Sequence, residues 1–155
     1  MDASDHVARA ESSVADRSGP DLDIATPLLV FGGCYSNLEA TRAIRAEAER
    51  LGIPPDRTIC TGDIVAYGAD AVETVAAIRD WRIHVVMGNC EESLGWAKAD
   101  CGCGYAADSA CAELSTVWYA YADARLGLDE RRWMRDLPRR LHIRMGGRRL
   151  AVVHG

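Results

Sequence analysis

Residues 27–33 read Pro-Leu-Leu-Val-Phe-Gly-Gly, a short continuous apolar run that two glycines end. Such a run is typical of a strand that is buried on both faces. Ser36-Asn-Leu-Glu39 follows at once and matches a capping box, in which Ser36 and Glu39 satisfy free backbone N–H groups at a helix start. Apolar side chains then recur at helical spacing as far as Leu51, so the segment predicts a strand followed by a helix.

The same unit occurs again along the chain. Residues 57–60 (Arg-Thr-Ile-Cys) predict a second strand, Asp70-Ala-Val-Glu73 predicts the cap of a second helix, and residues 83–87 (Ile-His-Val-Val-Met) predict a third strand. Alternating strands and helices favour right-handed parallel crossovers, and therefore a layered α/β fold. Functional side chains in such sheets gather beyond the carboxyl ends of the strands, here in three loops at 32–37, 62–68 and 88–92.

The rest of the chain is predicted to be more helical and to end in a hairpin. Asp129 is expected to cap a short helix, and the segments 141–145 and 148–153 flank Gly146-Gly147, a two-residue hairpin signal. One helical stripe is expected to pack inward, with further aromatic side chains beside it. The expected packing residues are Cys111, Leu114, Trp118, Tyr119, Tyr121, Trp133 and Leu137.

Length and composition bound the organisation of the chain. Its 155 residues, 48% of them apolar, suit one globular domain. Residues 1–24 lack apolar periodicity and are interpreted as a disordered leader, which leaves 25–155 as the domain. No apolar run approaches the roughly 18 residues of a membrane helix, and there is no export signal, so a cytoplasmic location without membrane contact is expected.

Net charge and cysteine content indicate which partners are expected, whether nucleic acid, a phosphate group or a metal ion. A net charge of −5 does not favour nucleic acid, although residues 131–149 hold eight arginines and one acid. That segment fits a solvated helix face and hairpin, or else a phosphate or RNA surface. The six cysteines are expected to stay reduced. Four of them could enclose a thiolate-bound metal, namely Cys90, Cys101, Cys103 and Cys111. The paired C-x2-C knuckles of a structural zinc site are missing, however.

Four motifs occur in order at the predicted strand ends. They are Tyr35-Ser-Asn-Leu-Glu-Ala40, Thr61-Gly-Asp-Ile-Val-Ala-Tyr-Gly68, Met87-Gly-Asn-Cys-Glu91 and Val152-Val-His-Gly155. Together they resemble the calcineurin-like metallophosphoesterases, in particular the compact bacterial phosphodiesterase branch, over residues 28–155. The resemblance implies a layered metallophosphoesterase-like sandwich, represented by its first half, with inserted helices and the C-terminal hairpin. Without the second sheet of that sandwich, apolar strand faces would be exposed and self-association is expected.

The resemblance also implies a metal site. Asp63 would be the bridging carboxylate, and Asn89 and His154 would be further ligands of one or two divalent ions, Mn, Fe or Zn. Carboxylate, amide oxygen and imidazole suit these ions. Two positions depart from the family pattern, because Gly33 and Tyr35 stand where the family has a metal-binding Asp and His. The final G-H-x-H motif of the family does not occur in the chain.

The function that follows is metal-dependent hydrolysis of a small phosphorylated substrate, by a phosphatase or phosphodiesterase. Asn89 and Cys90 are the candidate catalytic residues, since Cys90 stands where the family has a His that acts on the substrate. Two alternatives remain open. One is a catalytically degenerate relative that binds a phosphorylated ligand or protein partner, and the other is a Cys-rich metal or redox module.

Overall fold

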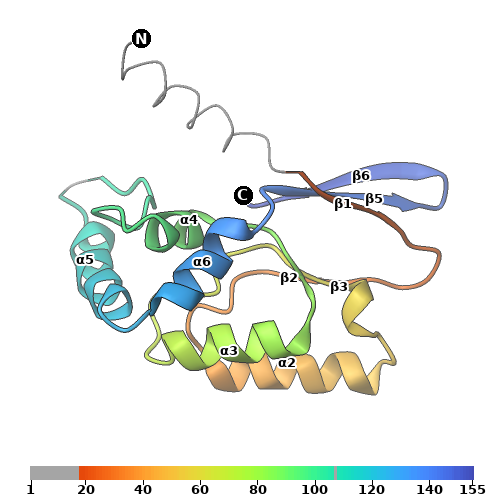
Figure 1. The fold of residues 1–155 in the computed structure, drawn as a ribbon, viewed down its shortest axis with the longest axis horizontal. Coiled ribbons are helices and arrows are strands. Elements are labelled where there is room, and N and C mark those ends of the chain that lie inside the picture. Colours follow the sequence, from red (N-terminus) through yellow and green to blue (C-terminus); the bar gives the residue numbers. More distant parts are fainter. Residues whose placement is uncertain (1–17, 107) are drawn as a thin grey trace, which may run out of the picture.

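The computed structural model describes residues 18–106 and 108–155 of the chain (Figure 1). Its elements, in chain order, are β1 (Ser18–Asp23), β2 (Leu29–Phe31), α2 (Leu38–Arg50), the 3-10 helix η1 (Pro55–Arg57), β3 (Thr58–Cys60), α3 (Ala71–Trp81), β4 (His84–Val85), α4 (Asn89–Gly95), α5 (Ala110–Asp123), α6 (Leu128–Asp136), β5 (Arg140–Met145) and β6 (Arg148–Val153).

Two three-stranded sheets and a helix pair form three layers. Strands β2, β3 and β4 form a parallel sheet in that order, and β1, β5 and β6 form the second sheet. Helices α2 and α3 run side by side below the parallel sheet, and the second sheet lies above it (Figure 1). One core cluster joins the helices to the parallel sheet, through residues such as Ala48, Val75 and Cys60. The predicted α/β layering is confirmed.

A smaller core cluster joins the two sheets. Ile59 of β3 and Val86 pack against Leu141 and Ile143 of β5, and all four side chains are at most 1% exposed. The expectation that this chain lacks a second sheet is therefore wrong. Strand β1 and the predicted hairpin build that sheet between them, with β1 parallel and β6 antiparallel to β5. Gly146 and Gly147 form the hairpin turn with φ of 56° and 75°, which glycine adopts readily.

The predicted disordered leader of residues 1–24 needs correction at its end. Residues 18–23 form β1, and Ile24 is only 5% exposed in the core between the sheets. The segment has no strand-like apolar pattern, because it is held by backbone pairing with β5, by one apolar side chain, Leu22, and by polar contacts to arginines of β5. The remainder of the predicted leader, residues 1–17, lies outside the described residues.

Two expectations about the first strand and helix are also wrong. Strand β2 was expected to be buried on both faces, but it is an edge strand and Val30 is 45% exposed. Ser36 was expected to cap α2. The cap is Asn37, whose Oδ1 accepts the Ala40 N–H at 2.9 Å. Ser36 is buried instead, and its Oγ accepts the Ala66 N–H at 3.2 Å, so it ties two loops together.

In the helical part, some expected packing residues face outward. Trp118 and Tyr119 of α5 are buried as predicted, whereas Cys111 and Leu114 are exposed. Helix α6 begins after Gly127 and not after Asp129, and the Gly127 N–H donates to Glu130 at 3.0 Å. The stripe prediction failed because α5 contacts the rest of the protein mainly through its C-terminal half.

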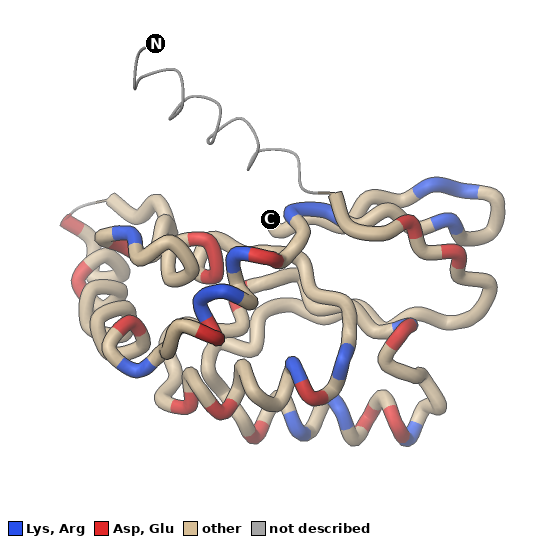
Figure 2. The backbone as a smooth tube through the Cα atoms, in the orientation of Figure 1, with Lys and Arg blue, Asp and Glu red and all other residues tan. Residues whose placement is uncertain are grey.

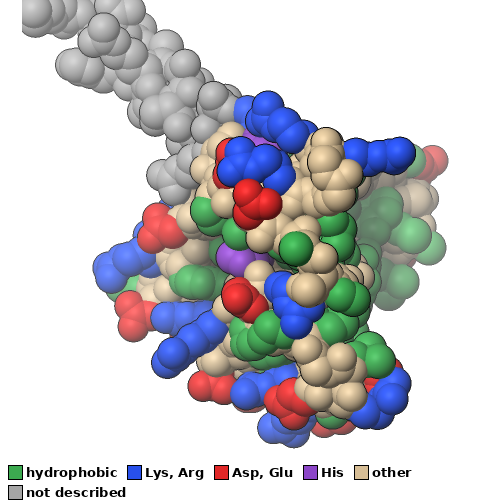
Figure 3. All heavy atoms as spheres, turned by 90° about the vertical axis from the view of Figure 1, so that its right-hand side faces the viewer, with side chains coloured by type: hydrophobic (Ala, Val, Ile, Leu, Met, Phe, Trp, Pro, Cys, Tyr) green, Lys and Arg blue, Asp and Glu red, His purple; other side chains and the backbone are tan. Residues whose placement is uncertain are grey.

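Charged side chains are spread over the surface with both signs. Acidic and basic residues both occur along helices α2 and α3 (Figure 2), and both signs are interspersed on the face drawn in Figure 3. Several arginines of residues 131–149 make structural contacts. Arg131 donates to the Leu94 carbonyl at 2.7 Å, and Arg139 pairs with Glu92 at 2.9 Å. No helix among the described residues is long and apolar enough to cross a membrane.

Candidate functional site

Three of the predicted site residues meet at one place. Asp63 follows β3, Asn89 begins α4 just after β4, and His154 follows β6. The Nε2 atom of His154 lies 3.0 Å from Oδ1 of Asn89 and 3.5 Å from Oδ2 of Asp63. The side chains of His154 and Asp63 are 24% and 14% exposed, so both are largely buried but still reach solvent. The expectation that these strand ends converge is confirmed, and the role of the residues stays a prediction.

The imidazole of His154 is oriented by a backbone group. Its Nδ1 lies 2.7 Å from the carbonyl oxygen of Thr61. Because a carbonyl can only accept, this hydrogen bond requires the proton on Nδ1. In the neutral imidazole, Nε2 then carries a lone pair, and it faces the oxygens of Asn89 and Asp63. In the imidazolium, Nε2 instead carries a proton that is donated to Oδ1 of Asn89 and faces Asp63, so a proton or a metal ion at Nε2 would join the three groups.

The amide of Asn89 is oriented in the same way. Its Nδ2 donates to the Cys101 carbonyl at 2.8 Å, which leaves Oδ1 facing His154. The amide oxygen and nitrogen are thus distinguished by their hydrogen-bond partners. The loop that carries Cys101 therefore fixes which atom Asn89 presents to the site.

A buried carboxylate holds the turn that carries Asp63. Glu91 is fully buried, and its carboxylate accepts backbone N–H groups of Asp63 at 2.7 Å, Ile64 at 2.8 Å and Gly88 at 3.0 Å. Burial raises the pKa of Glu91, and the charge of Asp63 acts in the same sense, while these N–H donors favour the ionised form. Sequence reasoning assigned no role to Glu91, because its partners are backbone groups that leave no sequence signal.

Gly33 and the ring of Tyr35 contact each other. A Cβ atom at Gly33 would lie 2.6 Å from the Asp63 carbonyl oxygen and 2.7 Å from Cε1 of Tyr35. The ring of Tyr35 thus packs against the Cα of Gly33. A side chain at residue 33 would therefore require the Asp63 backbone to shift and the Tyr35 ring to turn away.

Cys90 contacts Asp63 through its backbone. Its N–H donates to Oδ1 of Asp63 at 3.2 Å, and its side chain is 1% exposed. Burial raises the pKa of the Cys90 thiol, and the nearby charge of Asp63 raises it further. Such a thiol is protonated at neutral pH, which disfavours the nucleophilic role and leaves the N–H as the group that Cys90 offers to the site.

The expected reduced state of all six cysteines is not observed. Cys101 and Cys103 form a disulfide, because the Gly102 turn between them brings their side chains together. Cys111 is exposed on α5. Within residues 18–106 and 108–155, no group of three or more His, Cys, Asp or Glu side chains could hold a metal ion. The four-thiolate site considered from the sequence is therefore not formed.

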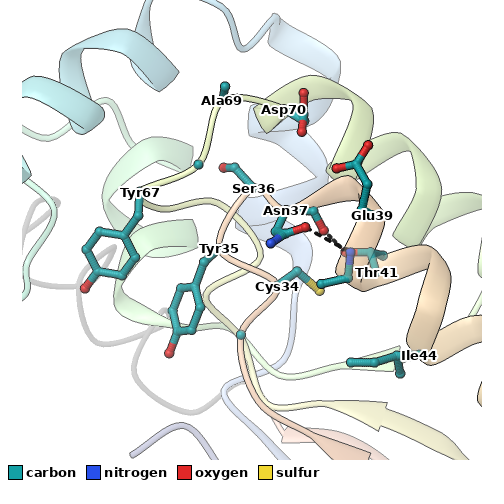
Figure 4. Close-up of a pocket in the computed structure, with 13 residues that line it drawn as sticks. Cys34, Tyr35, Ser36, Asn37, Glu39, Thr41, Ile44, Tyr67, Ala69 and Asp70 are labelled. Atoms are coloured by element: carbon teal, nitrogen blue, oxygen red, sulfur yellow. Dashed lines mark hydrogen bonds between the residues drawn. The ribbon is translucent and has the colours of Figure 1, made fainter.

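A cleft of about 550 Å³ opens beside this site (Figure 4). Residues 33–37 and the first turns of α2 form one wall, and residues 67–70 form the other. The rings of Tyr35 and Tyr67 lie side by side at one end, and the carboxylates of Glu39 and Asp70 lie at the other (Figure 4). Gly33 and Tyr35 belong both to this cleft and to the surroundings of Asp63.

Comparison with known proteins gives a fold-level result. No family model matches the chain. The uncharacterized protein MJ0912 of Methanocaldococcus jannaschii is 38% identical over 66 residues, which are 43% of this chain and 26% of that protein. The crystal structure of a “putative diadenosine tetraphosphatase” matches with a TM-score of 0.52 and 16% identity, over 79% of this chain and 49% of that one. The chain thus spans about half of that structure, and it is similar to it in its mixed α/β fold.

Proposed function

We propose that this protein is a metal-dependent phosphoester hydrolase whose metal is held by Asp63, Asn89 and His154. The observation that carries the proposal is the arrangement of Nε2 of His154, Oδ1 of Asn89 and Oδ2 of Asp63. These atoms face one another at 3.0 and 3.5 Å, and Nδ1 on the opposite side of the ring lies 2.7 Å from the Thr61 carbonyl oxygen. Either a second proton on the imidazole or a metal ion at Nε2 would satisfy these oxygens, and we propose the metal ion.

The donor set fits a divalent ion. A carboxylate, an amide oxygen and an imidazole suit Mn, Fe or Zn. A ligating histidine typically donates its other ring N–H to a carbonyl or carboxylate, and the Nδ1–H of His154 donates to Thr61. When bound, such an ion polarises a phosphoryl oxygen and lowers the pKa of a water molecule. The fold likeness to part of a phosphatase structure supports the same reaction class.

The protein's own groups would keep this donor set in place. Glu91 fixes the backbone at Asp63, the Cys101 carbonyl fixes the amide of Asn89, and Thr61 fixes the ring of His154. Each orienting group is a backbone atom or a fully buried carboxylate. The ligands are therefore ordered before an ion or a substrate arrives, which lowers the cost of binding.

The test is metal uptake and hydrolysis by wild type and Asp63→Asn. Mn²⁺ binding is measured by calorimetry, and the hydrolysis of bis(p-nitrophenyl) phosphate by absorbance. Asp129→Asn is the matched control, because Asp129 pairs only loosely with Arg132 on the exposed face of α6. We expect Mn²⁺-dependent hydrolysis in wild type and the control, and neither uptake nor activity in Asp63→Asn. Equal rates in wild type and Asp63→Asn would reject the proposal.

A second candidate is a relative that binds a phosphorylated ligand or protein without hydrolysing it. Gly33 and Tyr35 favour this candidate, because neither offers the carboxylate or imidazole of the family's first metal position. Binding of inorganic phosphate without turnover, in metal-loaded protein, would favour the binder over the enzyme.

A further inference from the structure

A disulfide lies beside the proposed metal site and takes no part in its donor set. It joins Cys101 to Cys103 across Gly102, in the glycine-rich segment of residues 100–105 between α4 and α5 (Figure 1). Disulfides stabilise a fold mainly by closing long loops, and this one joins residues only two positions apart. Its contribution to stability by loop closure is therefore small, and a chemical role has to be considered.

The two sulfur atoms differ in their access to solvent. Cys101 is 4% exposed and belongs to the main core cluster, whereas Cys103 is only partly buried at the margin of that cluster. An incoming thiol can therefore reach Sγ of Cys103 more easily than Sγ of Cys101. The backbone N–H of Cys103 donates to Sγ of Cys101 at 3.3 Å. This N–H would stabilise the sulfur of Cys101 as the leaving thiolate.

The segment that carries the disulfide has few other anchors. Within the part of the chain that the structure describes, no hydrogen bond between backbone groups ties residues 99–105 to another segment. The Gly102 N–H donates to Oδ1 of Asp100 at 2.8 Å, which closes the turn locally. The Cys101 carbonyl accepts from the side chain of Asn89 at 2.8 Å. The shape of the segment thus depends on side-chain contacts, and the disulfide is the covalent one.

The disulfide turn packs directly on Asn89. Nδ2 of Asn89 lies 3.5 Å from Sγ of Cys103, and a Cβ atom at Gly102 would lie 3.7 Å from Cβ of Asn89. When the S–S bond breaks, the two sulfurs must separate to van der Waals contact. Because Cys101 is buried, Cys103 and the exposed Gly102 are the residues that move. The Cys101 carbonyl belongs to the peptide unit that this movement rotates.

We propose that Cys101 and Cys103 form a redox site, at which a dithiol reductant opens the disulfide and thereby releases the amide of Asn89. The first thiol attacks Sγ of Cys103, so a mixed disulfide forms as the bond to Cys101 breaks. The second thiol then attacks the reductant's own sulfur in the mixed disulfide, which releases Cys103 and oxidises the reductant to a cyclic disulfide. Two electrons and two protons pass to the cysteines. The consequence for metal binding rests on the proposed function, whereas the release of Asn89 does not.

The first test follows the redox state and Asn89 together. Folded protein is equilibrated with reduced and oxidised dithiothreitol at graded ratios, quenched in acid, unfolded and labelled with iodoacetamide. We expect four labels in the oxidised form, six in the reduced form, and four again after reoxidation. Asn89 and Asn37 are the only asparagines of the chain, which has no glutamine, so its NMR spectrum holds two side-chain amides. Reduction should shift the amide signals of Asn89 and leave those of Asn37 unchanged.

The second test measures Mn²⁺ affinity by calorimetry, after dithiothreitol has been removed under argon. Losing a group that orients a metal ligand lowers metal affinity, so we expect reduced wild type to bind Mn²⁺ at least about tenfold more weakly than the oxidised form. Cys103→Ser, which cannot form the disulfide, should bind as weakly as reduced wild type and should not respond to dithiothreitol. Cys111→Ser is the matched control and should behave as wild type, because Cys111 is exposed on α5 outside the disulfide.

The outcomes separate this inference from the proposed function. Four labels after treatment of the folded protein with dithiothreitol would overturn the redox site. Six labels with unchanged Asn89 signals would overturn the release of Asn89. Equal Mn²⁺ affinity in the two redox forms would overturn the coupling to the metal and leave the proposed metal site intact. No Mn²⁺ binding in either form would reject the proposed function, while the labels and the Asn89 signals would still decide the redox site.

Discussion

The carboxylate of Glu91 accepts the backbone N–H of Asp63 at 2.7 Å, so a buried acid sets the turn that carries the proposed metal ligand. Asp63 has a φ of 57°, and its neighbour Ile64 donates to the other oxygen of Glu91. The position of the Asp63 carboxylate thus depends on a residue whose side chain is fully buried. This relationship links the stability of the fold to the geometry of the site.

The first prediction concerns that link. Glu91→Gln leaves one acceptor oxygen and places an NH₂ donor against backbone N–H groups, so we expect a loss of about 2–4 kcal/mol in the free energy of unfolding. Glu92→Gln is the adjacent control. Glu92 pairs at the surface with Lys98 and Arg139, so its replacement should cost less than about 1 kcal/mol. Urea unfolding measures both, and equal losses would contradict the structural role of Glu91.

The second prediction concerns metal and stability. An ion bound only by the folded chain raises the melting temperature in proportion to the logarithm of its free concentration. Mn²⁺ should therefore raise the melting temperature of wild type, and chelation should reverse the rise. Asp63→Asn should melt close to metal-free wild type, because asparagine tolerates the left-handed backbone of this position. A rise of equal size in Asp63→Asn would show that Mn²⁺ binds elsewhere.

The third prediction tests the linkage of Gly33 and Tyr35. In Gly33→Asp the new Cβ would contact the Tyr35 ring and the Asp63 carbonyl, so we expect a destabilisation of about 1–3 kcal/mol. Adding Tyr35→His removes the contact with the ring. The double variant should then be more stable than the sum of the single effects predicts, with a coupling of at least about 0.5 kcal/mol. Additive effects in chemical unfolding would mean that the two positions are independent.

The fourth prediction concerns pH. Burial raises the pKa of Tyr119 to about 12, and the hydrogen bond with Tyr105 raises the pKa of Tyr67. An acid whose pKa is higher in the folded state loses its proton first in the unfolded state. Its contribution to stability is thus complete below the usual tyrosine pKa of about 10 and is lost as the pH rises toward 12. Absorbance at 295 nm should show later ionisation in folded than in unfolded protein, and Tyr119→Phe should reduce the difference.

The fifth prediction concerns the cysteines. Cys34, Cys60 and Cys90 are buried with their thiols unpaired in disulfides, whereas Cys111 is exposed. Iodoacetamide should therefore add one label to the native protein and four to the denatured, unreduced protein, as read by intact mass. Two further labels after reduction would report the Cys101–Cys103 disulfide. Fast labelling of Cys90 in the native state would contradict the burial of its thiol.

Elements whose apolar pattern matches their environment could be predicted from the sequence. The short apolar runs predicted the parallel strands β2, β3 and β4, and Gly146-Gly147 predicted the hairpin of β5 and β6. Strand β1 was missed, because a segment with the sequence Ser-Gly-Pro-Asp-Leu-Asp joins its sheet mainly through backbone pairing and offers one apolar side chain, Leu22, to the core. Such pairing depends on a partner far along the chain, and a local pattern cannot reveal it.

Some features of the candidate site could be predicted from the sequence and others could not. The convergence of Asp63, Asn89 and His154 could be expected, since each follows a strand and strand ends share an edge of a sheet. The role of Glu91 could not be predicted, because it depends on which backbone N–H groups point toward its carboxylate. The contacts among Tyr35, Tyr67 and Tyr105 were also missed, because these residues come from three separate segments that only tertiary packing brings together.

The pairing of β1 with β5 has a consequence for the order of folding. Ser18 and Arg140 meet across this pair although they are 122 residues apart in the chain. Closing so long a loop is entropically costly and is repaid only once neighbouring structure exists. During synthesis the parallel sheet with α2 and α3 is complete long before β5 leaves the ribosome. We therefore expect β1 to be the last strand to dock, and the turn bearing Asp63 to form before His154 reaches it.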